Sequence, residues 1–261
     1  MTEGRVAVRV MTWNLWWRFG PWRERQKAIL SVLRDLRPDL VGLQEVWSAD
    51  GENLAEWLAT ELDLHWTWAP SPAPDRWRRR IDDPSIDIGN AILSRWPVEE
   101  REVLRLPVPP DLDDGRLGLY ARTGPVSFIT AHLTSAPDTT AVRTEQAAAL
   151  AEFARREGTV IVTGDFNAES DSEELSQFRG HFRDAWTEAA APAAPSATWD
   201  WDPALPYRMG RTRQEARIDY VYLGGPGSVR DVSRAGDHPV DGIWPSDHAA
   251  VVVELTVTDP T

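Results

Sequence analysis

Short apolar runs that end on a polar residue recur along this chain and limit the folds it can adopt. Residues 6–10 alternate between apolar and polar, as in a half-buried strand, and the run continues into Asn14. A stripe of apolar residues at helical spacing follows over residues 22–36. Residues 39–45 then form a second short apolar run, which ends on the carboxylate Glu45. This order predicts a strand, a helix and another strand, and therefore a sheet that is covered by helices.

The rest of the chain predicts several consecutive strands with helices on their flanks. Strands are expected at 86–93, near 101–106, at 117–122, at 126–132, at 159–163, at 217–223, near 229–233 and at 249–256, and helices at about 52–62 and at 138–157. Residues 66–84 and about 196–216 are rich in Pro, Trp and Arg and are predicted to be loops. We therefore expect an α/β protein with mixed sheets, folded as a single domain over residues 1–261.

The composition of the chain excludes several classes of function. It has no cysteine, which rules out disulfides, thiolate catalysis and cysteine-ligated metal centres. The 28 Lys and Arg against 41 Asp and Glu give a net charge of −13, which opposes nonspecific coating of nucleic acid and binding to an anionic membrane. No apolar run approaches the roughly 18 residues of a membrane-spanning helix, and the first residues lack the apolar centre of a signal peptide. These features favour a soluble, cytoplasmic protein, and the shortage of exposed apolar signals favours a monomer.

The polar residues at the ends of the predicted strands are the candidate functional residues. They are Asn14, Glu45, His132, Asp165, Asn167, Asp219, Asp247 and His248. In open α/β sheets ligands bind outside the strand ends, so these side chains converge if the strands share one edge or two facing edges. Carboxylates brought together in this way would raise one another's pKa unless a cation lay among them. An oxygen-rich set suits Mg²⁺, Mn²⁺ or Ca²⁺ better than zinc, and such a cation beside histidines suits chemistry at phosphoryl oxygens.

Seven short motifs in order carry a resemblance to a known family. They are Thr12-Trp13-Asn14, Leu43-Gln44-Glu45, Gly89-Asn90-Ala91-Ile92-Leu93-Ser94-Arg95, Thr130-Ala131-His132-Leu133-Thr134-Ser135, Gly164-Asp165-Phe166-Asn167, Arg217-Ile218-Asp219-Tyr220 and Ser246-Asp247-His248. One such motif alone is weak, but the set, which spans residue 8 to about 255, resembles the endonuclease/exonuclease/phosphatase superfamily with its DNase I-like fold. The resemblance implies a four-layer α-β-β-α sandwich of two mixed sheets.

The resemblance also implies a metal site and a catalytic base. Glu45 would be the principal metal ligand, and Asn14 and Asp247 would complete or border the site. Asp165 would orient and deprotonate the attacking water, while Asn167 would hold a phosphoryl oxygen. The alternative for Asn14 is a turn or capping residue, and Asp165 with Asn167 could instead form an Asx turn.

Two histidines complete the machinery that the resemblance implies. His248 would donate to the phosphate and would be held in tautomer and charge by Asp219, as a carboxylate does behind a catalytic histidine. His132 would contact the phosphate or assist the leaving group. The alternatives are a surface ion pair between Asp219 and Arg217, and a core position for His132. The implied activity is hydrolysis of a phosphoester that depends on a divalent metal.

The sequence indicates the type of reaction more clearly than it indicates the substrate. His132 and Ser135 stand where abasic-site endonucleases typically show Tyr and Asn, which argues against repair of abasic sites. The candidate substrate-binding residues are Ser135, Asn90, Arg78, Arg79, Arg211, Trp77 and Trp199, because arginines could form a basic rim and tryptophans could stack on a base or sugar. The alternative is that these arginines pair with nearby acids on a solvated surface.

Three functions remain open from the sequence. A phosphodiesterase or phosphatase that acts on a compact phosphorylated molecule or a short single strand is the preferred interpretation. A DNase-like endonuclease or exonuclease is the second. A catalytically silent binding protein on the same fold is the third, but it would be expected to have lost a ligand or the base, and every motif position is filled.

Overall fold

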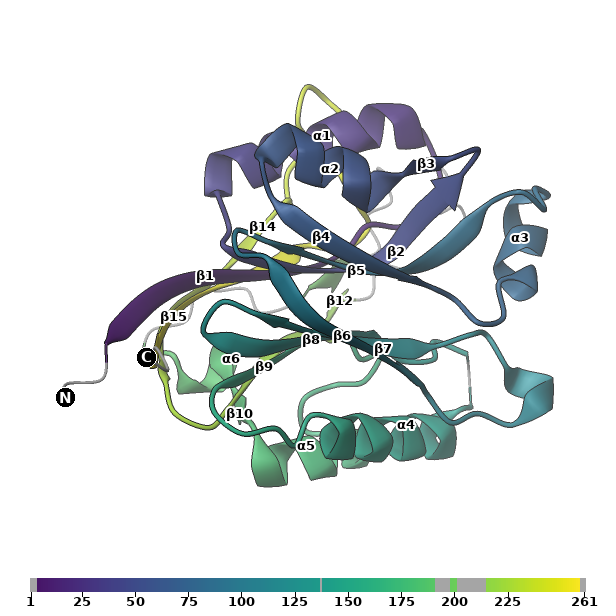
Figure 1. The fold of residues 1–261 in the computed structure, drawn as a ribbon. Coiled ribbons are helices and arrows are strands. Elements are labelled where there is room, and N and C mark those ends of the chain that lie inside the picture. Colours follow the sequence, from purple (N-terminus) through teal and green to yellow (C-terminus); the bar gives the residue numbers. More distant parts are fainter. Residues whose placement is uncertain (1–3, 137, 191–197, 201–214, 259–261) are drawn as a thin grey trace.

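Two mixed β-sheets lie face to face in the computed structural model, which describes residues 4–136, 138–190, 198–200 and 215–258 (Figure 1). The first sheet has the strand order β14 (Ser228–Ala235), β15 (Ala250–Thr258), β1 (Arg5–Asn14), β2 (Leu40–Ala49), β5 (Asp87–Ser94) and β4 (His65–Pro70), with β3 (Glu52–Asn53) paired to β2. The second has the order β10 (Arg183–Asp184), β13 (Asp219–Gly224), β9 (Val160–Asp165), β8 (Val126–His132), β7 (Leu117–Thr123) and β6 (Val98–Arg105). Each sheet is mixed, since β1 runs parallel to β2 and β8 parallel to β9 among otherwise antiparallel pairs.

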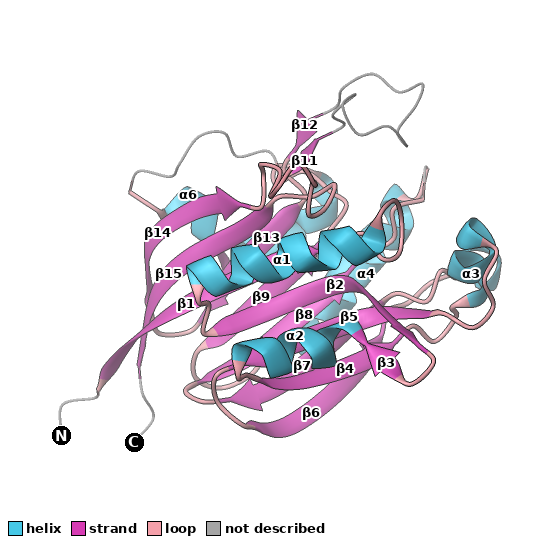
Figure 2. Cartoon of the chain, turned by 90° about the horizontal axis from the view of Figure 1, so that it is seen from above, coloured by secondary structure: helices cyan, strands magenta, loops and turns pink. Residues whose placement is uncertain are grey.

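Helices cover the outer faces of both sheets (Figures 1 and 2). On the first sheet lie α1 (Trp22–Leu36) and α2 (Leu54–Leu62), and on the second lie α4 (Thr140–Phe153) and α5 (Ser176–His181). The short helices α3 (Asp75–Ile81) and α6 (Ala185–Glu188), the 3-10 turns at Pro110–Leu112 and Glu173–Leu175, and the small pair β11 (Trp199–Asp200) and β12 (Glu215–Ala216) complete the described elements. The four-layer α-β-β-α sandwich expected from the sequence is therefore confirmed.

The alternation of side chains along the strands builds a core on each side of each sheet. Val8 and Val10 of β1 face the second sheet and pack in the cluster between the sheets, whereas Met11 and Trp13 pack beneath α1 and α2. A third cluster, which includes Phe166, fills the space between the second sheet and α4 and α5. Three apolar layers thus separate the four layers of backbone. The polar residues at the strand ends do not belong to these layers.

The loop predicted at residues 66–84 is wrong. Residues 66–84 were expected to lack regular structure, yet they contain most of β4 and all of α3. β4 forms because it pairs antiparallel with β5 from His65 to Pro70, and such long-range pairing outweighs local composition. α3 follows directly on Pro74 and buries Trp77, which is 5% exposed.

The other predicted elements occur with shifted ends. The helix expected at 52–62 begins at Leu54, because Asn53 caps it by accepting hydrogen bonds from the backbone N–H groups of Ala55 and Glu56. The helix expected at 138–157 spans Thr140–Phe153. In the segment expected as a loop at about 196–216, the described residues form β11 and β12, and residues 201–214 lie outside the description. None of the helices in the described ranges is long and apolar enough to cross a membrane.

Gly42 of the first sheet lies tightly against the second sheet, and its replacement is expected to destabilise the fold. A Cβ atom there would lie 2.2 Å from Thr163 Oγ1 and 2.7 Å from Thr130 Oγ1, both on the second sheet. We expect Gly42→Ala to lower the free energy of unfolding by about 1–3 kcal/mol, as overpacking does in other cores. Denaturant unfolding measures this change.

Gly180→Ala is the matched control for that prediction. Gly180 lies in α5, and a Cβ atom there would meet nothing within 4 Å. Alanine in a helix costs less conformational entropy than glycine, so this variant is expected to be neutral or up to about 1 kcal/mol more stable. Equal stability of the two variants would show that the sheets can separate freely at Gly42.

Candidate active site

The strand ends of both sheets meet at one place. His132, Asp165 and Asp219 are direct neighbours on β8, β9 and β13, because His132 and Asp219 are each in register with Asp165. In the first sheet, Asn14 ends β1 and is in register with Gln44 of β2. The register of strand pairing thus brings together side chains that lie at the ends of separate strands in the sequence.

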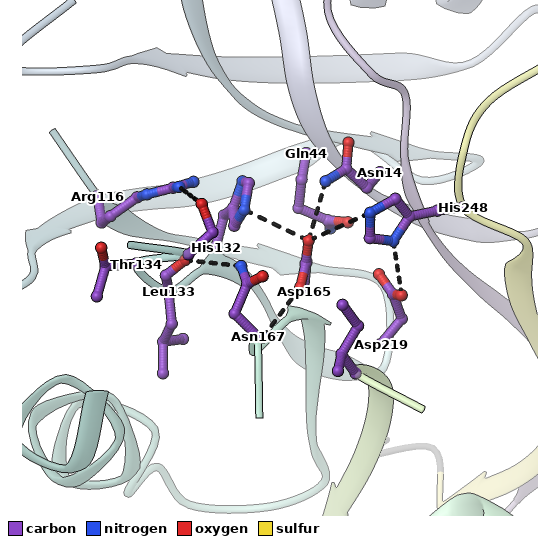
Figure 3. Close-up of polar contacts among 12 residues, drawn as sticks. Asn14, Gln44, Arg116, His132, Leu133, Thr134, Asp165, Asn167, Asp219 and His248 are labelled. Atoms are coloured by element: carbon purple, nitrogen blue, oxygen red, sulfur yellow. Dashed lines mark hydrogen bonds and ion pairs between the residues drawn. The ribbon is translucent and has the colours of Figure 1, made fainter. Parts of the chain in front are cut away.

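Asp165 is the centre of this cluster (Figure 3). Its Oδ2 accepts a hydrogen bond of 2.9 Å from Asn14 Nδ2 and lies 3.4 Å from His132 Nε2 and 3.7 Å from His248 Nε2. Its Oδ1 accepts the backbone N–H of Asn167 at 3.0 Å. Only 1% of the residue is exposed, and this burial, together with the nearby Asp219, raises its pKa to about 7. A carboxyl group with such a pKa suits the exchange of a proton near neutral pH.

His248 forms a buried pair with Asp219. His248 Nδ1 lies 2.9 Å from Asp219 Oδ2, and its backbone carbonyl accepts a hydrogen bond from the Trp13 indole. Burial alone would lower the pKa of His248, but the charges of Asp219 and Asp165 outweigh it and raise the pKa to about 9. The imidazole is therefore charged at neutral pH, and its Nε2 can donate a hydrogen bond.

His132 has the opposite protonation state. Its burial and the positive charges of Arg116 and His248 hold its pKa well below the usual value, so its ring is neutral at neutral pH. Two histidines on either side of Asp165 thus differ in charge because of their surroundings. A neutral His132 suits contact with a substrate oxygen better than the donation of a proton to a leaving group.

Glu45 lies in a β-bulge. The pairing of β2 with β5 shifts by one residue between Leu43 and Val46, and Glu45 has a φ of 54°, a strained value for a residue other than glycine. Bulges re-aim side chains, and this one brings Glu45 to the wall of a pocket shared with Asn90 and His132. Strained backbone of this kind is found disproportionately at functional sites.

Unpartnered carboxylate oxygens indicate that a cation fits this place. Glu45 Oε2 and Asp219 Oδ1 are both buried without a hydrogen-bond partner among the described residues. Single atoms of Asp165, Asp219 and His248 also lie within 4.8 Å of one another, but there the charged imidazole already balances the carboxylates, so the cation belongs on the Glu45 side. A buried carboxylate oxygen without a donor is costly unless a cation or a donor from substrate reaches it. The oxygen-rich set favours a hard divalent ion.

The two other residues expected at the metal differ in their surroundings. Asn14 Oδ1 accepts the backbone N–H of Trp16 at 2.9 Å, so the amide group turns its Nδ2 toward Asp165. Asp247 is half-buried, with its Oδ1 at 4.0 Å from His248 Nε2. Asp247 therefore borders the cluster, and Asn14 contacts the carboxylate at its centre.

The candidate substrate-binding residues fall into three groups, which lie at the small pocket, in α3 and outside the described residues. Asn90 and Trp77 line the same small pocket as Glu45, whereas Ser135 is exposed and accepts a hydrogen bond from Arg116, a residue of the pocket wall. The Trp77 indole is 5% exposed and donates to the Asp114 carbonyl, so it has no open face for stacking.

Of the two candidate arginines in α3, one is paired with acidic residues and the other is exposed. Arg78 Nη2 forms an ion pair of 2.6 Å with Asp87, and Arg78 Nη1 one of 3.1 Å with Asp75, as in the alternative of paired surface charges. Arg79 is exposed on the same helix. Arg211 and the side chain of Trp199 lie outside the described residues, although the backbone of Trp199 forms β11.

Sequence reasoning missed Arg116 and Asp114. These residues form a buried ion pair of 2.7 Å beside His132, and Asp114 also accepts the hydroxyl hydrogen of Thr134. Arg116 directly precedes a predicted strand, but no motif or periodicity marks it or Asp114 as part of the site. Gln44 was also left without a role, and it connects the two sheets by donating to Thr130 Oγ1 at 2.8 Å.

The fold and site can be compared with known proteins. A crystal structure of TDP2 from C. elegans is 22% identical, with a TM-score of 0.74 over 97% of this chain and 75% of that chain. TDP2 from D. rerio, in complex with a single strand DNA product, is 19% identical, with a TM-score of 0.75 over 95% and 98%. A family protein from Bacteroides thetaiotaomicron is 19% identical, with a TM-score of 0.72 over 98% and 97%.

At these identities the solved structures establish the DNase I-like fold alone. No curated protein matches the chain in sequence. The model of the endonuclease/exonuclease/phosphatase family, however, matches residues 11–248, which include all seven motifs from Asn14 to His248. The chain is therefore a member of the endonuclease/exonuclease/phosphatase family.

Proposed function

We propose that the protein hydrolyses a phosphoester with a divalent cation, and that Asp165 is the base that activates water. The observation that supports this proposal is the environment of the Asp165 carboxylate, that is, its contacts and its raised pKa. One buried carboxylate with a pKa near neutrality is contacted by Asn14 and His132, and lies next to a charged His248. Membership of the family supports the same class of reaction.

Four residues of the chain take part in the proposed hydrolysis. Asp165 accepts a proton from the attacking water as the new O–P bond forms and the P–O bond to the leaving group breaks, and the leaving oxygen takes its proton from solvent. His248 donates from Nε2 to a phosphoryl oxygen, and Asp219 holds its Nδ1–H and stabilises its charge. Asn167 is assigned to the same phosphoryl oxygen. Its Nδ2 donates one hydrogen to the Leu133 carbonyl, and the amide group has a second hydrogen to donate to substrate.

Glu45, Asn14 and Asp247 are the residues proposed to hold the cation, which when bound polarises a phosphoryl oxygen and neutralises its charge. Mg²⁺ is the preferred ion, with Mn²⁺ or Ca²⁺ as alternatives. The partnerless Oε2 of Glu45 supports this assignment.

A compact phosphorylated substrate is the preferred class. The pocket that Glu45, Asn90 and His132 line is small and polar, and the net charge of −13 opposes wrapping of duplex DNA. A short single strand is the second candidate, favoured by the single strand DNA product held by the similar TDP2 from D. rerio. We further propose that the protein acts as a cytoplasmic monomer.

The proposal is tested by hydrolysis of four substrates with Mg²⁺ and with EDTA. These are bis(p-nitrophenyl) phosphate, p-nitrophenyl phosphate, a short end-labelled single strand and a supercoiled plasmid. We expect metal-dependent turnover of at least one small phosphoester, with little nicking of the plasmid. Turnover that persists in EDTA would contradict the metal dependence, and inactivity on all four would support the silent binding protein.

Loss of the Glu45 carboxylate charge is expected to remove the stabilisation by metal. For the wild type, Mg²⁺ at about 100 times its dissociation constant should add about 2.7 kcal/mol to the free energy of unfolding. Glu45→Gln should lose most of this gain, because a neutral amide is a weaker ligand for a hard cation. Thermal unfolding with and without Mg²⁺ measures the effect, independently of activity.

Glu152→Gln is the control for that experiment. Glu152 lies at the end of α4, where its side chain is 73% exposed and pairs with Arg155. The same chemical change there should leave the response to Mg²⁺ intact. A full response in Glu45→Gln would exclude Glu45 as a principal ligand.

A further inference from the structure

Arg25, a residue of α1, is a buried cation that contacts two segments of the active site. Only 1% of its surface is exposed. Its guanidinium donates five hydrogen bonds to backbone carbonyls, from Nε to Phe19 at 3.0 Å, from Nη1 to Leu15 and Pro245 at 2.8 Å each, and from Nη2 to Trp16 at 2.9 Å and Trp17 at 2.8 Å. One planar group therefore joins residues 15–19, which follow Asn14, to Pro245, which precedes Asp247 and His248.

The first of these segments needs such support. Trp16 and Trp17 have φ values of 57° and 42°, which residues other than glycine rarely adopt. Conformations of this kind persist only where neighbouring groups hold them. The backbone N–H of Trp16 donates to Asn14 Oδ1, and this contact directs Asn14 Nδ2 toward Asp165. The conformation that Arg25 holds therefore sets the orientation of the Asn14 amide.

The second segment is tied to the same strand end. Ser246 Oγ donates to the Asn14 carbonyl at 2.6 Å and accepts the backbone N–H of His248 at 3.2 Å. Arg25 and Ser246 thus form two adjacent cross-links between the segment after Asn14 and the segment that carries His248. Both act on the distance between His248 and Asp165.

We propose that Arg25 is a positioning residue for the phosphoester hydrolysis, and that it holds residues 15–19 and 245–248 together so that Asn14 and His248 meet Asp165. This inference rests on the proposed function. Burial of the guanidinium costs desolvation, which its five hydrogen bonds offset, and these bonds fix the two segments relative to each other. Five fixed donors in one plane suit that task, and lysine cannot reproduce them.

Arg25→Lys and Arg25→Met test the proposal. Arg25→Met, which loses all five bonds, is expected to lower kcat by about 10- to 100-fold, because small displacements of catalytic groups cost that much, while KM changes less than about threefold. Arg25→Lys should keep part of the activity. Hydrogen exchange should become faster in residues 15–19 and in residues 245–248 together.

Arg156→Met is the matched control. Arg156 binds both carboxylate oxygens of Glu102 at 2.8 Å and donates to the Phe153 carbonyl, at the edge of the second sheet away from Asp165. Its loss removes a well-bonded arginine and lowers stability, but kcat and exchange in the two active-site segments should stay unchanged. The proposal would be overturned if the Arg25 variants showed faster hydrogen exchange only within α1 and kept kcat within about threefold of the wild type.

Ser246→Ala keeps the test decisive if Arg25→Met does not fold. This small change cuts the second cross-link, so it should lower kcat in the same way, and its effect should not add to that of Arg25→Lys because the two residues hold the same pair of segments. Full additivity would overturn the proposal. If the wild type hydrolyses no phosphoester, the proposed function fails, while hydrogen exchange still decides whether Arg25 couples the two segments.

Discussion

Replacing Asp165 with asparagine is expected to lower kcat by about 10²- to 10⁴-fold, the usual contribution of a positioned general base. The amide has the same shape as the carboxylate but cannot accept a proton from water. Asn14 Nδ2 and the backbone N–H of Asn167 donate to this side chain, so the variant keeps at most one of these contacts without a clash of donors. Steady-state hydrolysis of bis(p-nitrophenyl) phosphate measures the loss.

The same variant is expected to fold. Removing a buried negative charge beside Asp219 relieves repulsion, so thermal stability should not fall in proportion to activity. Asp231→Asn, on the exposed part of β14, is the matched control and should keep wild-type turnover. If Asp165→Asn keeps more than about a tenth of the wild-type kcat, a different group is the base.

Removal of the His248 imidazole is expected to lower kcat by about 10²- to 10³-fold, the typical cost of losing one donor to a developing charge. Its Nε2 donates only while the ring is charged, and Asp219 maintains that charge. Asp219→Asn should therefore lower kcat in the same direction, and the double variant should lose little more than His248→Ala alone. Independent, additive losses would show that Asp219 does not act through His248.

The pH dependence of stability provides a second readout for His248→Ala. The pKa of His248 is raised to about 9 in the folded protein from an ordinary value of 6.5. Its contribution to stability is therefore complete below pH 6.5 and disappears as the pH rises through about 9. The shift corresponds to about 3 kcal/mol. In EDTA, denaturant unfolding of the wild type should show this loss between pH 6.5 and 9, and His248→Ala should flatten it.

The order of the motifs predicted the family better than it predicted the geometry of the site. The sequence placed Asn14, His132, Asp165 and Asp219 at strand ends, and their convergence followed once the strands shared a register. It could not reveal that Glu45 lies in a bulge, since a left-handed backbone at a glutamate has no local sequence signal. The roles of the individual residues, and a cytoplasmic monomer, stay predictions.

The remaining errors have a common physical cause. β4 and α3 were missed because local composition favours a loop there, whereas pairing with β5 and burial of Trp77 are contacts distant in sequence. Arg116 was missed for a related reason, because its function follows from a partner, Asp114, whose burial only the fold determines. Arg25 looks like an ordinary surface residue of an amphipathic helix until the carbonyls around it are known.

The pairing of β15 with β1 has a consequence for how the protein is made. The strand that lies beside residues 5–14 is supplied by residues 250–258, so the first sheet draws its members from distant parts of the chain. A ribosome must release nearly all of these residues before that sheet can close, and contacts so remote in sequence form slowly. His248 lies in the same late segment, so a polypeptide that ends before residue 248 would lack the imidazole that we propose to donate to the phosphoryl oxygen.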